Sequence, residues 1–472
     1  MKRAMWLRLV LSGLAVAPAA PAAAQIGATG QCELTSSGGV TNINRALGIT
    51  WIGGGALFHC PRGVTIRADS AVLMETQGMA EFVGAVRYTD STRVMTADWA
   101  QYQRDQAILV ASGNVTLSDQ STGTTIRNAP YMTYYQSTET RPEELIYIPS
   151  GRPEAVLVRA GEAGAVPDTT WIVADQLNIH GKSRFLARGD VVITRTDVRG
   201  TGREAEYTEE LHELRLHGAA RLVGEDYELT GDTIIAHTDE AERLREVVAR
   251  GAGELVSDES DVRVSAPFLR ITLVDGEVER LVAVVPLEAR GVPPAVEPEV
   301  DDPDAERAAE PVRARAVSSD FTLIADSIDA RTPDRQLEEV IAIGHAYAER
   351  LDVDSSRVTL PAVIAKDWVK GDTIVATFGS QDTAAGQEER VIEQLTAIGA
   401  ETPAAALAML RDEAREPSFS YQIARWIQIR FSAGEVDVVE VDGLQQGLHL
   451  QPESAARTLG PRAGRGGGSG GS

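Results

Sequence analysis

The sequence is poor in the residues on which catalytic and metal sites depend. Its 472 residues include seven histidines and two cysteines. His212 and His217 are five positions apart, which on a strand places them on opposite faces and separates them as metal ligands. The glycine-rich stretches do not lie between a strand and a helix, and no glycine-flanked serine marks a nucleophile elbow. The sequence therefore predicts a protein that is not an enzyme, with no metal site and no cofactor.

Aromatic residues and positive charge are also scarce. Aromatics make up 5% of the chain, and the formal net charge is -24. Nucleic acid is an unsuitable partner for such a chain, because its phosphates are bound through Lys and Arg. An anionic ligand would have to be held through its apolar part. The aromatic poverty also disfavours an enzyme of the β-solenoid type acting on an envelope polysaccharide, which we keep as the less favoured alternative.

The first 24 residues have the features of a secretory signal peptide. Lys2, Arg3 and Arg8 come before a short apolar run at residues 9–16, and the small-residue stretch "PAAPAAAQ" follows. This order of charge, apolar run and small residues is typical of a cleaved leader, and the run is too short to span a membrane as a helix. We expect an exported, soluble protein.

Both cysteines, Cys32 and Cys60, lie near the expected mature N-terminus. Export brings a protein into a compartment where disulfides persist. A bridge between Cys32 and Cys60 that ties the first strands together is the favoured interpretation, and two unpaired thiols are the alternative.

A short pattern recurs along the chain, for example as "ADWAQY" at residue 97, "ADQLNI" at 174, "GDTIIA" at 231 and "GDTIVA" at 371. The positions two and four after the Asp are nearly all apolar, which indicates strands with one buried face. We expect the Asp, as in Asp98, to begin the strand by bonding the backbone just ahead of it. A second motif, seen as "SGNVTLSD" at residue 112 and in similar stretches, has a Gly just before the strand that follows a turn. This glycine motif recurs about every 30 residues.

The repeats predict an all-β fold built from stacked two-strand units. One unit is too small to bury its own apolar face, so neighbouring units must stack on one another and build one inner surface. The predicted fold class is an elongated antiparallel β architecture with one short helix. The period of two places these residues on the inner face: Ala100, Tyr102, Val115, Leu117, Leu177, Ile179, Val191, Ile193, Leu222, Ile234, Ile328 and Ile374.

The composition divides the chain into five segments. The helix is predicted near 403–415, because Thr402 can cap it, Pro403 falls in its first turn and Pro417 lies beyond its end. Residues 288–320 are rich in Pro, Ala and charge and have no period, which indicates a linker or long loop. We expect a signal peptide (1–24), a β block (25–287, with room for an internal break near 160–168), the linker (288–320), a second β block (321–453) and a flexible Gly/Ser-rich tail (454–472).

Three stretches resemble a known family. Residues 81–120, "EFVGAVRYTDSTRVMTADWAQYQRDQAILVASGNVTLSDQ", are similar to the OstA-like module of the LptA family, which includes the periplasmic lipopolysaccharide transport protein and the N-terminal domain of LptD. "SGRPEAVLV" at 150–158 and "LTGDTIIAHTDEAERLREVVARGAGELV" at 229–256 are similar to later parts of the same module. The chain departs from this family in its greater length, its acidic linker and its extra helix.

The resemblance implies a V-shaped β-jellyroll, or β-taco, whose inner face receives the acyl chains of lipopolysaccharide and whose ends join other modules edge to edge. It implies a non-enzymatic periplasmic bridge that carries lipopolysaccharide, or a related amphiphile, toward the outer membrane. The implied partners are that lipid, Lpt-type membrane components that add a strand at either end, and further copies of the chain. The twelve inner-face residues then become lipid-groove candidates, with ordinary core packing as the alternative for each. A structural or adhesin-like envelope protein is the alternative function.

Overall fold

The computed structural model describes residues 32–450 with the exception of 61–62, 160–167, 182, 197, 226, 241–242, 258–261, 290–311, 319–320, 351–365, 383–387, 413–414 and 433–434. The predicted signal peptide and the tail at 454–472 lie outside the described residues, as does most of the predicted linker. In the part of the chain that is described, no helix has the length and the apolar character that crossing a membrane requires.

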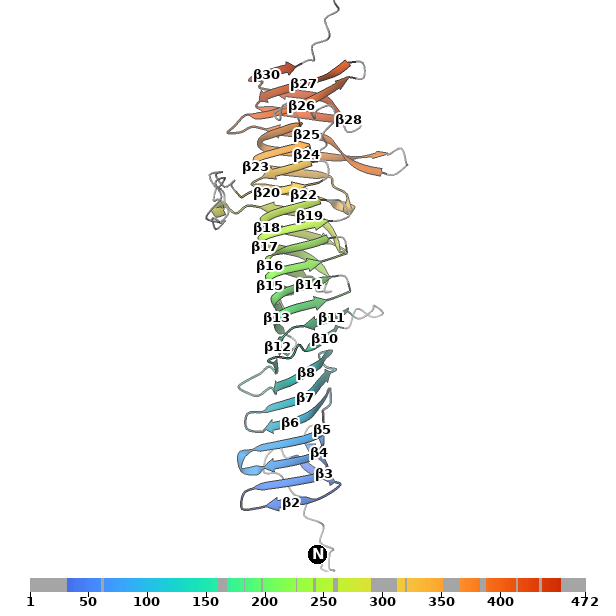
Figure 1. Cartoon of the computed structure of the whole chain (residues 1–472), viewed down its shortest axis with the longest axis vertical. Coiled ribbons are helices and arrows are strands. Elements are labelled where there is room, and N and C mark those ends of the chain that lie inside the picture. The colour runs from blue at the N-terminus through green and yellow to red at the C-terminus, as the bar shows by residue number, and fades with distance from the viewer. Residues whose placement is uncertain are drawn as a thin grey trace, which may run out of the picture. The chain divides into compact units, whose positions relative to one another are not determined.

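The chain divides into two compact units, Met1–Leu157 and Val158–Ser472, here called unit 1 and unit 2. In Figure 1 the described strands of unit 1 run from blue to cyan and those of unit 2 from green to red. The strands of unit 1 are β1 (Glu33–Ser37), β2 (Thr41–Asn44), β3 (Ile49–Cys60), β4 (Val64–Met74), β5 (Met79–Thr89), β6 (Arg93–Gln103), β7 (Ile108–Asp119), β8 (Thr124–Tyr135), β9 (Leu145–Ile148) and β10 (Glu154–Arg159), which ends just past the boundary; the 3-10 helix η2 (Glu75–Gln77) joins β4 to β5.

Unit 2 continues the same pattern over twenty more strands. These are β11 (Asp168–Val173), β12 (Gln176–His180), β13 (Arg184–Thr194), β14 (Arg199–Thr208), β15 (Glu213–Val223), β16 (Tyr227–Thr238), β17 (Leu244–Ser257), β18 (Val262–Val274), β19 (Glu277–Val284), β20 (Ala314–Val317), β21 (Phe321–Ala325), β22 (Ser327–Arg331), β23 (Glu339–Arg350), β24 (Trp368–Asp382), β25 (Glu388–Ile398), β26 (Ala404–Asp412), β27 (Arg415–Ala424), β28 (Trp426–Ser432), β29 (Glu435–Asp442) and β30 (Gln446–Leu450). The 3-10 helices are η3 (Glu209–Leu211), η4 (Leu287–Ala289) and η5 (Pro333–Arg335).

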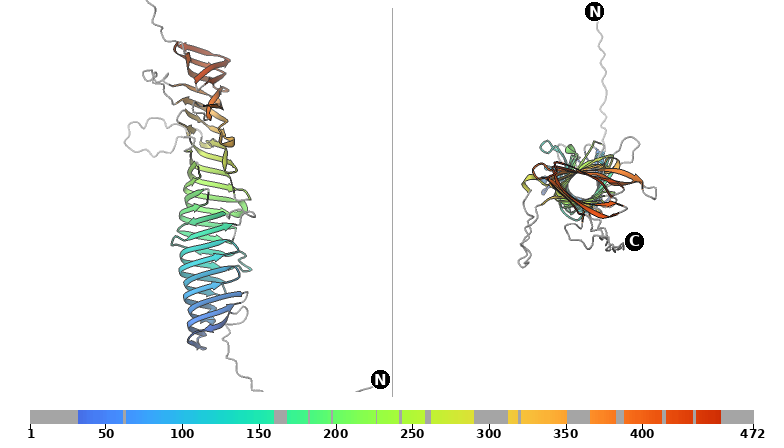
Figure 2. Two further views of the ribbon diagram at one scale, coloured as in Figure 1. Left: turned by 90° about the vertical axis from the view of Figure 1, so that its right-hand side faces the viewer. Right: turned by 90° about the horizontal axis from the view of Figure 1, so that it is seen from above.

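Consecutive strands pair in antiparallel fashion from β3 to β8 and from β13 to β18. Within each unit the neighbouring strands lie side by side in the left view of Figure 2. The all-β antiparallel fold that the repeats predict, and the jellyroll-like form that the resemblance implies, are confirmed.

Alternate long strands have a β-bulge near their middle, and the pairing register shifts there. In β7 the bend is at Gly113 and Asn114, which have φ of 76° and 48°, and the pairing register with β8 shifts between Ser112 and Val115. A bulge inserts an extra residue and bends the strand, and Gly adopts a positive φ without steric cost. The same pair of positive φ values recurs at Gly84, Gly189, Gly218, Gly251 and Gly344 and at the residue after each.

The recurring Asp lies at these bends: Asp69, Asp98 and Asp232 are in the middle of a strand, whereas Asp175 and Asp326 come just ahead of β12 and β22. Asp98 is in the middle of β6, where its carboxylate packs over Gly113 of the next strand. Asp69, Asp175, Asp232 and Asp326 take the same place over Gly84, Gly189, Gly251 and Gly344, and Arg203 replaces the Asp over Gly218. The expectation that Asp98 begins its strand is therefore wrong. The side chain fills the space that a missing Cβ leaves on the neighbouring strand.

The bend divides every long strand of unit 1 into two halves that face each other. Two ladders of cross-strand neighbours line the inside: Phe58, Ile66, Tyr88, Met95, Leu117 and Ile126 in the first layer, and Ile52, Ala71, Phe82, Ala100, Ala111 and Met132 in the second layer. All twelve are buried. The rings of Phe58 and Phe82 meet edge to face across the layers, with their centroids 5.6 Å apart.

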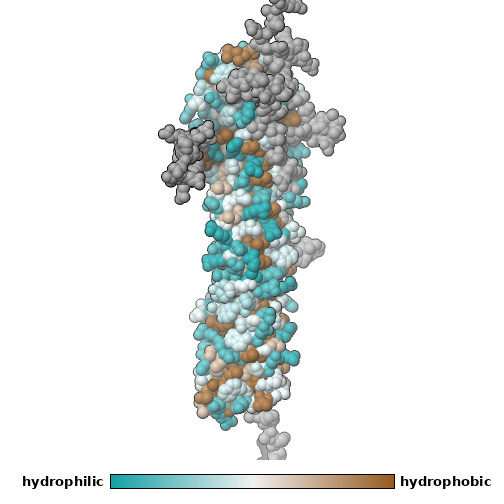
Figure 3. Space-filling view, viewed as in Figure 1, coloured by the Kyte–Doolittle hydropathy of each residue, from teal (hydrophilic) through white to brown (hydrophobic). Residues whose placement is uncertain are grey.

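The outer faces carry a mixture of hydrophilic and hydrophobic side chains (Figure 3). Ion pairs link neighbouring strands there, such as Arg188 with Glu204 at 3.0 Å and Arg221 with Glu228 at 2.5 Å. Exposed pairs of this kind contribute little to stability.

The helix predicted near 403–415 is wrong. Ala404–Asp412 form the strand β26, which pairs with β27 from Ala404 opposite Ala424 to Asp412 opposite Arg415. Residues 404–408 are all buried, including four alanines. Alanine is the best helix former, but helix propensity amounts to less than about 1 kcal/mol per residue and yields to pairing and burial in a narrow interior.

The predicted linker extends less far than residue 320. Ala314–Val317 form β20, which pairs with both β18 and β21. On the other side of the segment, β19 pairs with β22. Residues before 288 and after 320 thus belong to one compact unit, and the division between units falls after Leu157, just ahead of the break that the sequence suggests near 160–168.

Candidate functional site

Unit 1 encloses a cavity between its two layers. Its volume is about 580 Å³, and its apolar wall includes Phe58 and Ile66 from the first layer and Leu73, Phe82 and Leu109 from the second. A cavity of this size is in the range of sites that bind small molecules. The wall forms because strands β3–β7 present every second side chain inward and the bend turns both halves toward the same space.

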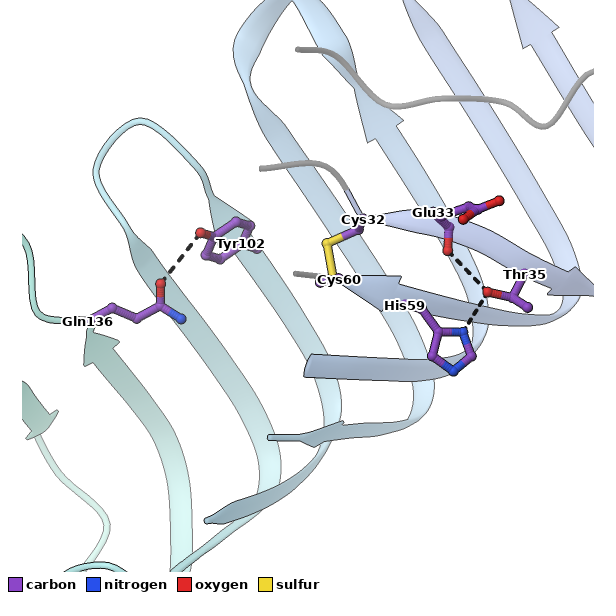
Figure 4. Close-up of a disulfide and its surroundings, with 7 residues drawn as sticks. All are labelled: Cys32, Glu33, Thr35, His59, Cys60, Tyr102 and Gln136. Carbon is purple, nitrogen blue, oxygen red and sulfur yellow. Dashed lines mark hydrogen bonds between the residues drawn. A yellow bond between two sulfur atoms is a disulfide. The ribbon is translucent and has the colours of Figure 1, made fainter. Parts of the chain in front are cut away.

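The cavity is bordered by a disulfide on one side. Cys32, next to the start of β1, is joined to Cys60, the last residue of β3, and both line the cavity. Figure 4 shows this bond beside the hydrogen bond between Thr35 Oγ1 and His59 Nδ1, which are 2.5 Å apart. Both links hold β1 against the end of β3, so the first strand keeps its place at the border of the cavity.

Polar residues line the cavity at the free ends of the strands, away from the bends. Glu75 and Gly78 come from the turn between β4 and β5, Asp90 from the turn between β5 and β6, and Arg104 from the turn after β6. Tyr102 donates from its hydroxyl to Gln136 Oε1 at 3.5 Å, as Figure 4 shows. The cavity therefore has an apolar interior and a charged rim.

A charged cluster of five residues spans this rim: Asp90, Arg93, Asp119, Tyr134 and Glu144, here called the rim cluster. Arg93 Nε donates to Asp119 Oδ2 at 2.6 Å, and Arg93 Nη2 lies 2.6 Å from Glu144 Oε2. Arg93 Nη1 also donates to the hydroxyl of Tyr134. Because Arg93 begins β6 and Tyr134 is near the end of β8, these bonds run across the opening between the layers.

The environment of the rim cluster shifts the pKa values of its members. Burial lowers the pKa of Arg93, but the hydrogen bond to Asp119 and the nearby Glu144 more than offset it, so the pKa of Arg93 is raised. Burial likewise opposes ionisation of Asp119, yet the hydrogen bonds from Ser121 and Arg93 outweigh it and lower its pKa. Burial is the main cause that raises the pKa of Tyr88 and of Tyr134. At neutral pH, Arg93 and Asp119 are charged and the two tyrosines are neutral.

The structure places the twelve predicted inner-face residues as follows. In unit 1, Tyr102 lines the cavity, while Ala100, Val115 and Leu117 are buried in the layers close to it. In unit 2, Leu177, Ile179, Val191, Ile193, Leu222, Ile234, Ile328 and Ile374 are all buried. Four of these, Leu177, Ile234, Ile328 and Ile374, lie on one continuous cross-strand ladder from β12 to β24.

Sequence reasoning missed most of the cavity wall and the whole rim cluster. Phe58, Ile66 and Phe82 obey the same period of two as the residues that were chosen, so the pattern could have found them. Arg93 and Glu144 carry no such signal. They are 51 positions apart, taking 144 less 93, and only the fold brings their side chains together.

Bent antiparallel strands with apolar inner faces define a jellyroll-like all-β protein. Residues 65–242 match the family model described as "LptA/(LptD N-terminal domain) LPS transport protein", so this part of the chain is similar to that family. The match begins in β4 and ends after β16, so it includes strands of both units.

Solved structures also include chains that are similar to this one. No curated protein matches the chain significantly. The chain is similar to the crystal structure of LptH, described as the LptA homologous periplasmic component of the conserved lipopolysaccharide transport device from Pseudomonas aeruginosa. The two are 13% identical over 40% of this chain and 82% of that chain, with a TM-score of 0.11.

Proposed function

We propose that this protein transports lipopolysaccharide or a related amphiphile, and that it works by holding the acyl chains inside its bent β layers. The observation that carries the proposal is the apolar cavity of unit 1, in the part of the chain that partly overlaps the matched family domain. Transport of a lipid requires a site that shields hydrocarbon from water and releases it again, and it requires no catalytic group.

The energetics of such a site are favourable. Burying a methylene group stabilises a complex by about 0.8 kcal/mol, so a chain of several methylenes is retained even by an acidic protein. The charged head group of the lipid would stay outside the cavity, in contact with water. The inward ladders of unit 2, which include Leu177 and Ile234, supply the same kind of surface and are a second proposed lipid-binding face.

We also infer that the terminal strands dock Lpt-type membrane components, or further copies of the chain, in the periplasm. β2 pairs with β3 and β30 pairs with β27, so each lies at an end of the described strands of its unit. Exposed apolar side chains gather there: Val40 and Ile43 near β2, and Leu448 and Leu450 on β30. Strand addition at an open edge is a common way for β proteins to bind partners.

Site-specific photo-crosslinking in cells tests the lipid proposal. A crosslinking residue at Leu117, which is buried between the layers, is expected to capture lipid, whereas one at the exposed neighbour Thr116 is not. In unit 2 the matched pair is Ile193, which is buried, and Arg188, which is exposed. Capture at neither buried position, or equal capture at all four, would count against the proposal. Mass spectrometry of the purified protein would identify the lipid that is bound.

A further inference from the structure

Acidic side chains outnumber basic ones around the cavity of unit 1. Two arginines, Arg93 and Arg104, line the cavity with three carboxylates, Glu75, Asp90 and Glu144, and they contact two more, Asp119 and Asp105, outside its lining. Arg141 lies nearby and donates to the carbonyl oxygens of Gln136 and Ala107. The rim therefore carries a net negative charge even when Arg141 is included.

Both arginines at the rim already form ion pairs with carboxylates. Arg93 contacts Asp119 and Glu144, each at 2.6 Å, and 16% of its side chain is exposed. Arg104 Nε lies 3.1 Å from Asp105 Oδ1. A phosphate or carboxylate that approached Arg93 would have to displace a carboxylate from it and would then lie beside the remaining acids. Such like-charge contacts are unfavourable where the local dielectric constant is low.

We propose that the rim of this cavity is a charge filter, which admits the uncharged hydrocarbon part of an amphiphile and keeps anionic groups out. The proposal rests on the proposed lipid-binding function and adds the chemical selectivity of that site. It makes Arg93 and Glu144 specificity-determining residues with opposite effects. The filter gives a transported lipid one orientation, with its acyl chain inside and its negatively charged head outside.

An alternative role for the rim cluster is purely mechanical, as a brace that holds the two layers together. The two roles differ in the effect of neutralising each partner. Arg93→Gln and Glu144→Gln break the same ion pair, but the first makes the rim more negative and the second makes it less negative. A brace predicts the same direction of change for both variants, whereas a charge filter predicts opposite directions.

The experiment uses the full exported protein and three probes with the same chain: decanol, decanoate and decyltrimethylammonium. Their dissociation constants are measured by calorimetric titration at low ionic strength. We expect the wild-type protein to prefer decanol to decanoate. We expect the ratio of decanoate affinity to decanol affinity to fall about two- to sixteenfold in Arg93→Gln and to rise by a similar factor in Glu144→Gln, the effect of one charge at about 10 Å for effective dielectric constants between about 80 and 20. The cation should show the reverse changes.

Two further variants serve as controls in case Arg93→Gln does not fold. Glu75→Gln alters an exposed residue of the turn between β4 and β5 and should raise the same ratio, as Glu144→Gln does. Glu204→Gln neutralises an exposed carboxylate of unit 2, outside the cavity, and should leave the ratio unaltered. Circular dichroism confirms that each variant is folded.

The outcomes separate the two proposals. Binding of decanol by the wild type with no charge-dependent shift in any variant, or with shifts in one common direction, would overturn the filter and leave lipid binding intact. If the wild-type protein binds none of the three probes, the cavity is not a lipid site and the proposed function itself fails.

Discussion

The carboxylate of Asp98 lies directly over the α-carbon of Gly113 on the next strand, so that a Cβ built on Gly113 would come within 2.5 Å of Asp98 Oδ2. Asn114 Nδ2 donates to the same oxygen at 2.8 Å. This contact joins two neighbouring bends, and its counterparts recur along the chain. The bends decide which side chains face inward, and so the contact positions the cavity wall.

Gly113→Ala should destabilise unit 1 because the new Cβ meets Asp98 and because φ at this residue is 76°. We expect a loss of about 2–4 kcal/mol in the free energy of unfolding. Denaturant unfolding followed by circular dichroism measures it. Gly63→Ala is the matched control, since Gly63 has the same φ of 76° and nothing within 4 Å of its built Cβ. Equal losses at the two sites would show that the contact with Asp98 contributes nothing.

The disulfide between Cys32 and Cys60 should stabilise unit 1 by restricting its unfolded chain. The cysteines are separated by 28 residues, and a loop of this size corresponds to about 3.5 kcal/mol in the chain-entropy model. The double variant Cys32→Ser/Cys60→Ser should unfold at a lower denaturant concentration than the wild type. A reducing agent should lower the wild-type midpoint to that of the double variant and leave the variant unchanged. A reductant-insensitive wild type would contradict the prediction.

Asp119 should make the stability of unit 1 depend on pH in the acid range. Its pKa is lowered in the folded state, so its stabilising contribution is complete above the ordinary value of about 3.9 and is lost as the pH falls through the folded value. Asp119→Asn should therefore cost about 2–4 kcal/mol at neutral pH, because Arg93 loses a charged partner. The difference from the wild type should shrink below pH 4.

Thermal unfolding at a series of pH values measures this difference. Asp105→Asn provides a control, since Asp105 pairs with Arg104 on an exposed turn, where ion pairs contribute little. A constant difference between wild type and Asp119→Asn from neutral pH to pH 2 would refute the assignment of the acid dependence to this carboxylate.

Asp372 should hold the turn that precedes β26. Its Oδ2 accepts hydrogen bonds from the backbone N–H groups of Ala400, Glu401 and Thr402 at 2.5, 2.7 and 3.1 Å, and the bond from Ala400 is the main cause that lowers its pKa. Asp372→Ala should speed hydrogen exchange at these three amides by about ten- to a hundredfold, since one hydrogen bond to a charged acceptor contributes about 1.5–3 kcal/mol. Asp372→Asn keeps an acceptor oxygen and should have a smaller effect. Unchanged exchange in Asp372→Ala would show that the turn holds without it.

The sequence by itself determined the fold class, the spacing of the repeats and the side of each strand that faces inward. The period of two is a local property, because successive side chains point to opposite faces of any strand. It placed Leu117, Ile193 and Ile234 on the buried face without reference to the rest of the chain. The recurring glycines, such as Gly113, identified where the backbone needs a positive φ.

Only the tertiary structure decided what role the recurring Gly and Asp residues have and which residues share a site. It showed that Gly113 and Asp98 bend the middle of two strands, and that residues 404–412 are a strand, because pairing with β27 outweighs the helix propensity of their alanines. It also brought Arg93 to Glu144 across the opening of the cavity. Contacts of this kind join residues distant in sequence, and they depend on how the layers fold over each other, which no local pattern encodes.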